Sequence, residues 1–490
     1  MNNKKAYSQL FFMILISLVT QIVAMIRMSV VAENFGTSVE MDAFNFSNSI
    51  GTFIFSFIST GVSTVLIPAI IQKKPRKQIN SFISIIYSFS ILIVILLILF
   101  RKVIISLFAN GSTEFTSVAS ILLVITMATQ FMHTILGVAI AVFQCRGKYN
   151  LPKILNLITA LILMALVILD NNLDIYRYAV YVMATNAFNG IIHFILVYRE
   201  KFIYTPCFDF KDSGVRHMFK IFLPTVFSSG LYQISLLADS MISQKLGEGN
   251  ISILTYSNTI MSLIATLLTS NLLLYLYPKI AASADKENGK EKLFQYFVFF
   301  TGIMLLITVG FFGIGREGIA FLYERGEFTA DITSKVYLCT VVYSLGLPIN
   351  VMRDIIYKYF YAKGLTKITF ANSIVASIFN IVISIILSFF IGIYGIALGT
   401  VLTSLLSLTT ITVRFVKNFG KPQNVPWVIR ESVKNFISFI ITFIIMILTH
   451  RFIAIDNNLI SIIVNTVICV CVYVCSLLIL KTNLTKVDLR

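Results

Sequence analysis

Residues 35–50 read FGTSVEMDAFNFSNSI, and the chain returns to the same pattern at residues 246–260, which read LGEGNISILTYSNTI. In both stretches a long apolar run ends at a glycine, Gly36 or Gly247, and polar residues then lead into the next apolar run. The glycines are 211 residues apart. The repetition of a whole helix-turn-helix pattern indicates an internal duplication.

Two further pairs support the duplication. The apolar runs that follow the two turns close at Ile67-Pro68 and Tyr277-Pro278, and the prolines are 210 residues apart. The sequence FQCRG at 143–147 is matched by FYAKG at 360–364, with an offset of 217 residues. In a membrane chain, such a repeat predicts two lobes that face a shared central site, which is the architecture of a transporter.

The composition is that of a membrane protein. Hydrophobic residues make up 57% of the chain, charged residues 12%, and the mean hydropathy is +0.87. A membrane-spanning helix needs about 20 apolar residues, because every backbone polar group in hydrocarbon must be bonded internally. We count fourteen such runs, near 10–32, 43–71, 79–100, 117–142, 153–169, 178–198, 219–244, 252–278, 293–314, 334–360, 368–391, 393–415, 433–453 and 459–480. The sequence therefore predicts an all-α polytopic membrane protein with about 14 transmembrane helices.

The repeat also sets the expected domains. We expect a first six-helix lobe at 1–200, a polar interfacial connector at 201–218, and a second six-helix lobe at 219–416. Residues 417–490 hold a linker with the single tryptophan and two helices that have no partner in the repeat. Because six is an even number, the two lobes share one topology and form a parallel repeat about an axis along the membrane normal. The seam between 391 and 393 is marked only by Gly392 and Gly395.

The distribution of lysine and arginine predicts the orientation. With both termini in the cytoplasm, the outer loops keep only seven of the 39 basic residues: Arg101, Lys102, Arg177, Lys245, Arg316, Arg325 and Arg451. This bias follows the positive-inside rule. Attraction to anionic lipid headgroups accounts for the net charge of +17, so we expect no nucleic-acid partner.

No cofactor or metal is expected. The six cysteines lack the paired spacing of a zinc site, and the four histidines share no local spacing suited to a metal.

Few ionisable residues lie in the apolar runs, and such residues usually face a cavity or a partner. Arg27 is deep in the first run and Asp42 stands at the outer mouth of the second. One interpretation makes Arg27 a cavity cation for an anionic substrate, because guanidinium binds phosphate in a bidentate manner. The other makes it a structural arginine tied to backbone carbonyls or to Asp42.

The remaining candidates are less decisive. Asp239 suits either a cation site or a helix-packing contact. Arg353 and Asp354 are neighbours on one helix, so we expect them to point in different directions and not to pair. The duplicated turns, at 36–42 and 247–250, are either plain hairpins or elements of an outer gate. The gate residues would be Gly36, Ser38, Gly247 and Gly249.

Several stretches resemble the MurJ (MviN) family. AMIRMSVVAENFG at 24–36, continuing through EMDAF at 40–44 to Pro68, is similar to the family's opening. LYERGEFT at 322–329 and FYAKGLTK at 360–367 also match it, as do Asn380 and GIYGIAL at 392–398. The resemblance covers roughly residues 10–416. It implies a fourteen-helix flippase, not an enzyme, within the superfamily of polysaccharide exporters and multidrug antiporters.

The resemblance further implies an activity and a place. Such a flippase would move lipid II, the lipid-linked peptidoglycan precursor, from the inner to the outer leaflet of a bacterial cytoplasmic membrane by alternating access. Its partners would be a polyprenyl-diphosphate-linked saccharide, membrane lipids and the cell-wall synthesis machinery. The two added helices would line a groove for the lipid tails.

The chain departs from the family at several positions. Arg27 and Asp42 match functional positions, but cavity arginines expected from the family fall on Gln21, Phe55 and Thr259, and an acid falls on Thr60. We keep Gln21 among the cavity candidates, which are Arg27, Asp42, Gln21, Asp239 and Arg353. The departures leave open a flippase for another polyprenyl-diphosphate-linked saccharide, of the O-antigen, capsule or teichoic type.

Two other classes remain as alternatives. A multidrug-type antiporter would share the two lobes, although the family matches and the two extra helices speak against it. A membrane glycosyltransferase is suggested by Glu40 and Asp42, since paired carboxylates can hold a metal and a sugar phosphate. Short outer loops leave no domain to bind an acceptor.

Overall fold

The structure is a computed structural model that describes residues 3–108, 112–266, 279–280, 283, 286, 288–452 and 457–482. The described residues form helices joined by turns, without a strand. The helices are α1 (Asn3–Phe35), α2 (Val39–Ile71), α3 (Arg76–Leu99), α4 (Arg101–Phe108), α5 (Thr113–Cys145), α6 (Asn150–Leu169), α7 (Ile175–Arg199), α8 (Ser213–Lys245), α9 (Asn250–Ile264), α11 (Gly289–Tyr323), α12 (Ala330–Ser344), α13 (Gly346–Ala362), α14 (Thr366–Ile391), α15 (Ile393–Phe419), α16 (Val425–Phe452) and α17 (Asn458–Ile479).

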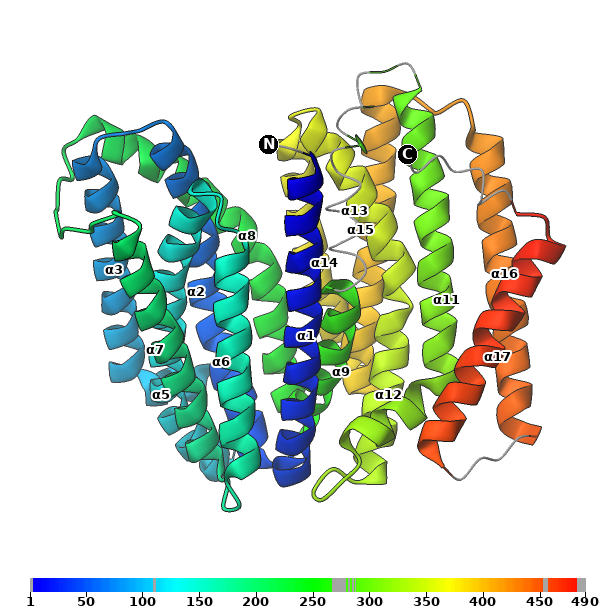
Figure 1. The fold of residues 1–490 in the computed structure, drawn as a ribbon. Coiled ribbons are helices and arrows are strands. Elements are labelled where there is room, and N and C mark those ends of the chain that lie inside the picture. The colour runs from blue at the N-terminus through cyan, green and yellow to red at the C-terminus, as the bar shows by residue number, and fades with distance from the viewer. Residues whose placement is uncertain are drawn as a thin grey trace. The chain divides into compact units, whose positions relative to one another are not determined.

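The chain folds as two compact units, Met1–Ser252 and Ile253–Arg490. In the first unit, α2 packs along α5 and α8, α1 packs on α6, and α5 packs on α7. In the second unit, α14 pairs with α15, and α11 packs on α12, α13, α16 and α17 (Figure 1). The lobe boundaries that we draw from the repeat follow the duplication, not this packing, and stay a prediction.

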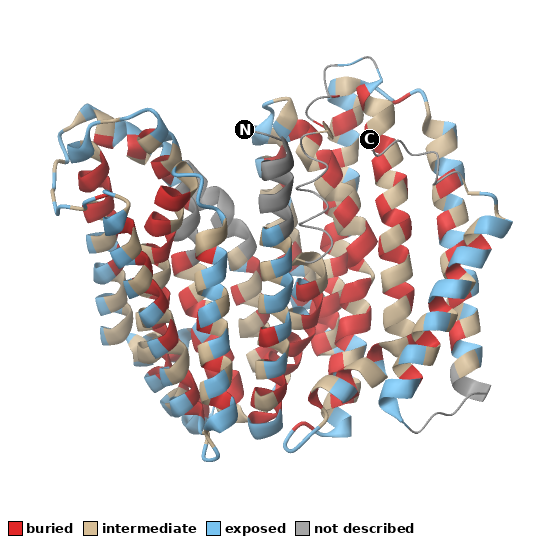
Figure 2. Ribbon diagram, viewed as in Figure 1, coloured by how far each residue is buried: buried red, intermediate tan, exposed pale blue. Residues whose placement is uncertain are grey.

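Eleven helical segments among the described residues are long and apolar enough to cross a membrane. The other three predicted spans correspond to α2, to α8, and to α9 with residues outside the described part of the chain. Large apolar side chains are exposed on the helix surfaces, including Phe389, 82% exposed, and Ile479, 79% exposed. Figure 2 shows exposed residues along many of the described helices. Hydrocarbon is the solvent that suits such surfaces, and the chain is a multi-pass, all-α membrane protein.

The third pair of repeat segments has the same local geometry in both copies. Helix α5 ends at Cys145 and α13 ends at Ala362, and the glycines that follow, Gly147 and Gly364, both have φ of +71°. The amide of Lys148 donates to the carbonyl of Phe143 at 2.9 Å. The equivalent bond, from Leu365 to Phe360, is also 2.9 Å. A left-handed glycine that closes a helix in this way is a Schellman-type cap.

The first repeat pair also uses equivalent side chains. The hydroxyl of Ser47 in α2 donates to the carbonyl of Ala119 in α5 at 3.1 Å. In the second unit the hydroxyl of Ser257 in α9 donates to the carbonyl of Val336 in α12, also at 3.1 Å. The two serines are 210 residues apart and the two acceptors 217, which are the offsets of the repeat itself. Tyr277-Pro278, the end of the second copy, lies outside the described residues.

The seam between the eleventh and twelfth predicted spans is confirmed. Helix α14 ends at Ile391 and α15 begins at Ile393, with Gly392 between them at φ +60°. Three residues later, a Cβ on Gly395 would lie 2.4 Å from the carbonyl carbon and oxygen of Leu387. Only glycine allows the first turn of α15 to approach the backbone of α14 this closely.

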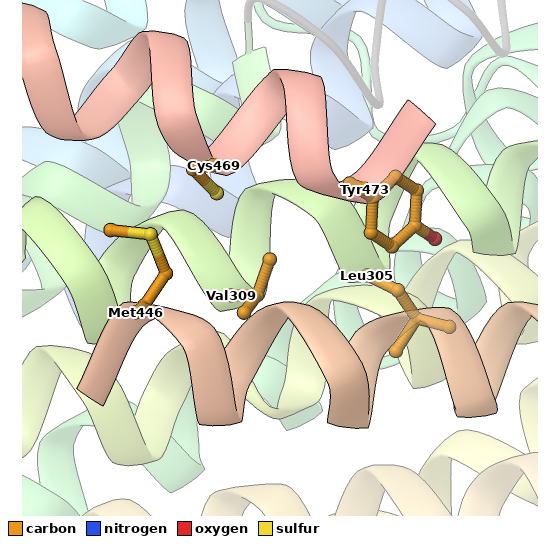
Figure 3. Packing of buried hydrophobic residues seen from close by; sticks show 5 residues of the cluster. All are labelled: Leu305, Val309, Met446, Cys469 and Tyr473. Carbon is orange, nitrogen blue, oxygen red and sulfur yellow. The ribbon is translucent and has the colours of Figure 1, made fainter. Parts of the chain in front are cut away.

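The last two helices attach to α11 through a packed core. Leu305 and Val309 of α11 meet Met446 of α16 and Cys469 and Tyr473 of α17 (Figure 3). The Tyr473 hydroxyl donates to the carbonyl of Gly302 at 2.8 Å, so its polar end is satisfied inside this core. The added helix pair is therefore an integral part of the second unit.

We expect Gly395→Ala to destabilise the protein by about 1–3 kcal/mol, because the new methyl group overpacks against backbone that cannot rotate away. The measurement is the apparent melting temperature in detergent. Gly310→Ala is the matched control, since no atom lies within 4 Å of a Cβ at Gly310 in α11. Equal melting temperatures for the two variants would contradict the close approach of α14 and α15.

Candidate functional site

The first duplicated turn places Asp42 at the start of α2. Ser38 is the N-cap residue, and its hydroxyl accepts a hydrogen bond from the amide of Met41 at 3.3 Å. Asp42 follows in the first turn and is only 2% exposed. An acid in the first turn of a helix is stabilised by the helix dipole. Burial of a carboxylate at this depth requires strong hydrogen-bond donors around it.

The donors come from the second duplicated turn. The Asp42 carboxylate accepts from the amide of Gly249 at 2.7 Å and from the amide of Ser252 at 2.8 Å. The Ser252 hydroxyl donates to the same carboxylate at 2.6 Å. Helix α9 begins at Asn250, so Gly249 is its N-cap position and Ser252 lies in its first turn. Glycine has no side chain to cap the helix, and a carboxylate from α2 supplies the cap instead.

Neighbouring residues complete what we call the two-turn cluster, namely Thr37, Asp42, Asn45, Gly249 and Ser252. The Asn45 side-chain amide donates to the Ser252 hydroxyl at 3.2 Å. A Cβ on Gly249 would lie 3.0 Å from the Thr37 hydroxyl, and the φ of Gly249 is +80°. Both the close contact and the left-handed backbone favour glycine at this position.

The sequence pointed to Asp42, Ser38 and the turn glycines but missed Asn45 and Ser252. A signal for Ser252 was present, because it stands 210 residues after Asp42 and is therefore its counterpart in the repeat. The two duplicated positions meet each other in the structure. Gly36 and Gly247 occupy left-handed turns, with φ of +49° and +120°. The role of these turns as a gate stays a prediction.

Arg27 lies in the apolar part of α1, which packs against α6. The side chain is half-buried, and its Nε atom is buried without a hydrogen-bond partner among the described residues. The Asp42 carboxylate, the other partner considered for Arg27, accepts hydrogen bonds from backbone amides of the second turn. An arginine in a spanning helix cannot lose its charge, so a buried guanidinium nitrogen without a protein partner is suited to bind an anion.

Four positions at which the family resemblance predicts further charges hold uncharged residues. Gln21 lies half-buried in α1, six residues before Arg27. Phe55 is fully buried in α2. The Thr259 hydroxyl donates to the carbonyl of Thr255 in its own helix at 2.8 Å. The side chain of Thr60 lies outside the described part of the chain.

The last two candidates are Asp239 and Arg353. Asp239 is buried in α8, and its backbone carbonyl accepts from the Ser243 hydroxyl at 2.6 Å. Arg353 in α13 donates from Nε and Nη2 to one carboxylate oxygen of Asp354, at 2.9 and 2.8 Å. Our expectation that these neighbours do not pair is wrong, because the long and flexible arginine side chain reaches the adjacent carboxylate. Its guanidinium also lies 5.7 Å from the centre of the Tyr357 ring.

The second unit contains an apolar groove of about 420 Å³. Its walls come from α9, α11 and α17, with Ile260, Phe311 and Val470 among the lining residues. Gly310 and Gly318 of α11 also line it, and a Cβ at either position would meet no atom within 4 Å. The missing side chains therefore leave open space on this face of α11. The volume is that of a small-ligand site, and the walls suit a hydrocarbon chain.

Comparison with known proteins gives a consistent result. The profile of the family described as "Lipid II flippase MurJ" matches residues 31–483. A probable lipid II flippase MurJ of Aquifex aeolicus is 26% identical over 401 residues, which span 79% of this chain and 79% of that protein. A probable lipid II flippase MurJ of Vibrio cholerae is 24% identical over 426 residues, spanning 80% of this chain and 79% of that protein.

Solved structures show the same fold. A structure described as "Lipid II flippase MurJ, inward closed conformation" superposes with a TM-score of 0.80 at 21% identity, covering 94% of this chain and 98% of that one. The Vibrio cholerae MATE transporter VcmN in its bent form gives a TM-score of 0.57 at 15% identity, covering 84% and 96%. Because the family profile spans nearly the whole sequence, the chain belongs to the MurJ lipid II flippase family.

Proposed function

We propose that this protein moves lipid II from the inner to the outer leaflet of a bacterial cytoplasmic membrane. The observation that carries the proposal is the family match over residues 31–483. The mechanism needs no cofactor and no covalent change of the substrate. The basic-residue bias supports an orientation with both termini in the cytoplasm, where the substrate and the cell-wall synthesis machinery meet the protein.

The charge chemistry supports a diphosphate substrate. A diphosphate cannot enter hydrocarbon unpaired, because a buried and uncompensated charge costs several kcal/mol or more. Arg27 offers a fixed cation whose Nε is buried and lacks a partner among the described residues. Its planar fork can hold two phosphate oxygens at once. We assign Arg27 to the diphosphate. The roles of Gln21, Asp239 and Arg353 as substrate-binding residues stay predictions from the sequence.

The apolar groove supports a lipid-linked substrate. A polyprenyl tail must stay in an apolar environment while the headgroup crosses the membrane. The groove between α9, α11 and α17 has apolar walls and involves the helix pair that lies outside the repeat. We propose that part of the tail rests there.

The two-turn cluster supports alternating access. The carboxylate of Asp42 links the turn before α2 to the turn before α9, and these turns are the equivalent elements of the two repeats. Alternating access in repeat transporters proceeds through rocking of one repeat against the other. We propose that the capped arrangement is the closed outer gate and that loss of the cap opens it.

One observation favours a second candidate function within the same class. Phe55 and Thr259 stand where the family has cavity arginines, and Phe55 is fully buried. A cavity with fewer cations suits a substrate with a different headgroup, such as another polyprenyl-diphosphate-linked saccharide. The two candidate substrates are distinguished by testing rescue in a strain depleted of its lipid II flippase and in a strain that lacks another saccharide flippase.

We expect expression of this protein to rescue a bacterial strain depleted of its own lipid II flippase, because the transported species is lipid II. The measurement is growth, together with the fraction of lipid-linked precursor on the cytoplasmic side of the membrane. Rescue should lower that fraction. Rescue of only a strain that lacks another saccharide flippase would assign the second substrate, and altered drug export with unchanged precursor sidedness would point to an antiporter.

We expect Arg27→Ala to abolish rescue and Arg27→Lys to impair it, because lysine keeps the charge but loses the bidentate geometry. Membrane abundance of each variant is measured alongside growth. Removing a charge from a spanning helix eases insertion by about 2.5–3.5 kcal/mol, so Arg27→Ala should remain in the membrane. Arg27→Lys keeps the charge, so its insertion should match that of the unsubstituted protein. Wild-type growth with Arg27→Ala would show that the diphosphate is held elsewhere, and loss of the variant from the membrane would support a structural role.

We expect cysteines at Thr37 and Gly249 to form a disulfide that blocks rescue, in a background without the six native cysteines. A Cβ at Gly249 would lie 3.1 Å from the Thr37 Cβ. Disulfides need about 3.5–4.5 Å between these atoms, so the two turns must move slightly apart for the bond to form. Ser38 is a poorer partner because its hydroxyl caps α2.

Asp42→Asn should slow this crosslink, because an amide offers one acceptor oxygen where the carboxylate offers two. The two single-cysteine variants are the controls, and reduction should restore growth. Growth that continues with the pair fully crosslinked would show that the turns are not the gate.

A further inference from the structure

The connector between α7 and α8 is built as a fixed strap. We call residues 201–212 the connector strap; they run from the end of α7 to the N-cap of α8 without helical structure. The strap is bonded to the first turns of α3. The amide of Cys207 donates to the Ser84 hydroxyl at 3.0 Å, and the amide of Asp209 donates to the Ser81 hydroxyl at 2.8 Å. The Asn80 side chain donates to the Thr205 hydroxyl at 2.7 Å.

These bonds explain the polar residues in an otherwise apolar helix. Asn80, Ser81 and Ser84 are all buried, and each bonds to the strap. A main chain held by buried side chains has little freedom to move. Its outward side chains are therefore presented in a defined direction.

The outward side chains include two phenylalanines. Phe208 is 56% exposed and Phe210 is 64% exposed, while Asp209 between them faces α3. This alternation is typical of extended backbone. The two rings stack, with centres 6.5 Å apart and an angle of 20° between their planes. Two aromatic rings presented together on a rigid segment indicate an apolar partner outside the chain.

Cations surround the aromatic pair. Arg216 in α8 donates from Nε to the carbonyl of Phe210 at 3.1 Å. Lys77 forms an ion pair with Asp209 at 2.9 Å, and Lys211 is exposed next to Phe210. The segments 73–77, 146–148 and 199–220, all at ends of the helices around the strap, hold eleven basic residues against three acids.

The acids are already engaged within the protein. Lys77 lowers the pKa of the Asp209 carboxyl through their hydrogen bond. Asp212 caps α8, accepting from the amide of Gly214 at 2.7 Å, and the backbone bonds lower its pKa. Glu200 forms an ion pair with Lys148. The surplus of positive charge is therefore left for an external anion.

Two lysines near the strap adopt a backbone conformation that usually favours glycine. Lys73 and Lys201, which follow α2 and α7, have φ of +54° and +58°. Glycine adopts this left-handed region at least cost, and other residues are strained there. Lysine at these helix ends keeps a positive charge near the negative end of each helix dipole.

We propose that the connector strap binds the anionic headgroups of the cytoplasmic leaflet. Phe208 and Phe210 insert among the lipid headgroups, and Lys211, Arg216 and Lys220 contact the lipid phosphates. The partner is a membrane surface because the strap begins at the end of α7, a helix long and apolar enough to span the membrane. It then leads into α8, which the sequence predicts as a span, and this position corresponds to headgroup level. Figure 1 shows the strap running between α7 and α8. Exposed aromatic rings flanked by basic residues are suited to such a surface. The inference rests on the orientation proposed above but not on the identity of the substrate.

The test uses the full-length protein with Phe208→Trp in a Trp427→Phe background, so that residue 208 carries the single tryptophan. The protein is reconstituted into vesicles of zwitterionic lipid, or of the same lipid with phosphatidylglycerol, each containing chains brominated near the headgroup. We expect blue-shifted emission and quenching that increase severalfold with phosphatidylglycerol.

Tyr176→Trp in the same background is the matched control. Tyr176 is exposed in the first turn of α7, at the opposite end of that helix, beside Asp174 and Arg177. Its quenching should not depend on phosphatidylglycerol. Water-like emission from residue 208 in both vesicles would overturn the proposal, as would equal dependence on phosphatidylglycerol at both positions.

Charge variants complete the test. Lys211→Gln with Lys220→Gln should remove most of the dependence on phosphatidylglycerol at residue 208, because both lysines are exposed. Lys211→Arg with Lys220→Arg should retain it. Unchanged dependence in the glutamine variant would show that these cations do not bind the lipid and would overturn their assignment. Because the readout is fluorescence, a failure here is distinguishable from failure of the flippase proposal.

Discussion

Hydrocarbon offers no hydrogen-bond partner to a polar group, and most of the described structure follows from this constraint. Helices satisfy the backbone, and hydroxyl side chains in them bond to carbonyls of the preceding turn, as Thr308 does with Met304 at 2.9 Å. Where an amide is buried, several partners gather around it. The Asn372 side chain in α14 donates to the Tyr357 hydroxyl at 2.9 Å and to the Ser407 hydroxyl at 2.8 Å, which ties α13, α14 and α15 together.

The same constraint explains why the duplication survives in geometry more clearly than in sequence. Ser47 and Ser257 bond to equivalent carbonyls, and Gly147 and Gly364 close equivalent helices at the same φ. Asp42 and Ser252 are the informative exception. The two equivalent positions differ in residue type, one an acceptor and the other a donor, so they can bond to each other. The difference between the copies therefore allows a link that two carboxylates at these positions would not make.

Helical geometry could be predicted from the sequence, whereas the pairing of individual side chains could not. Length and hydropathy located the spans and the seam at Gly392, because a helix in hydrocarbon has few alternatives. The repeat identified the turns around Gly36 and Gly247, and family resemblance identified Arg27 and Asp42. The partners of these residues could not be predicted, since pairing depends on side-chain direction. The Arg353–Asp354 pair shows this, because residue spacing predicted separation whereas the reach of arginine allows contact. The short helix α4 was likewise expected to be loop.

The exceptions to complete hydrogen bonding are the best pointers to function, because an unsatisfied buried group must be stabilised by something outside the protein or must carry a cost. Several other buried polar atoms also lack hydrogen-bond partners among the described residues, including the Ser384 hydroxyl and the side-chain oxygen of Asn380. These two groups are neutral, and a water molecule can satisfy them. Arg27 differs because its guanidinium is a cation. A single water cannot replace an anion there. Arg27 therefore stands in an apolar helix at a cost that an anionic ligand would offset, which is the reason for proposing that it binds the diphosphate.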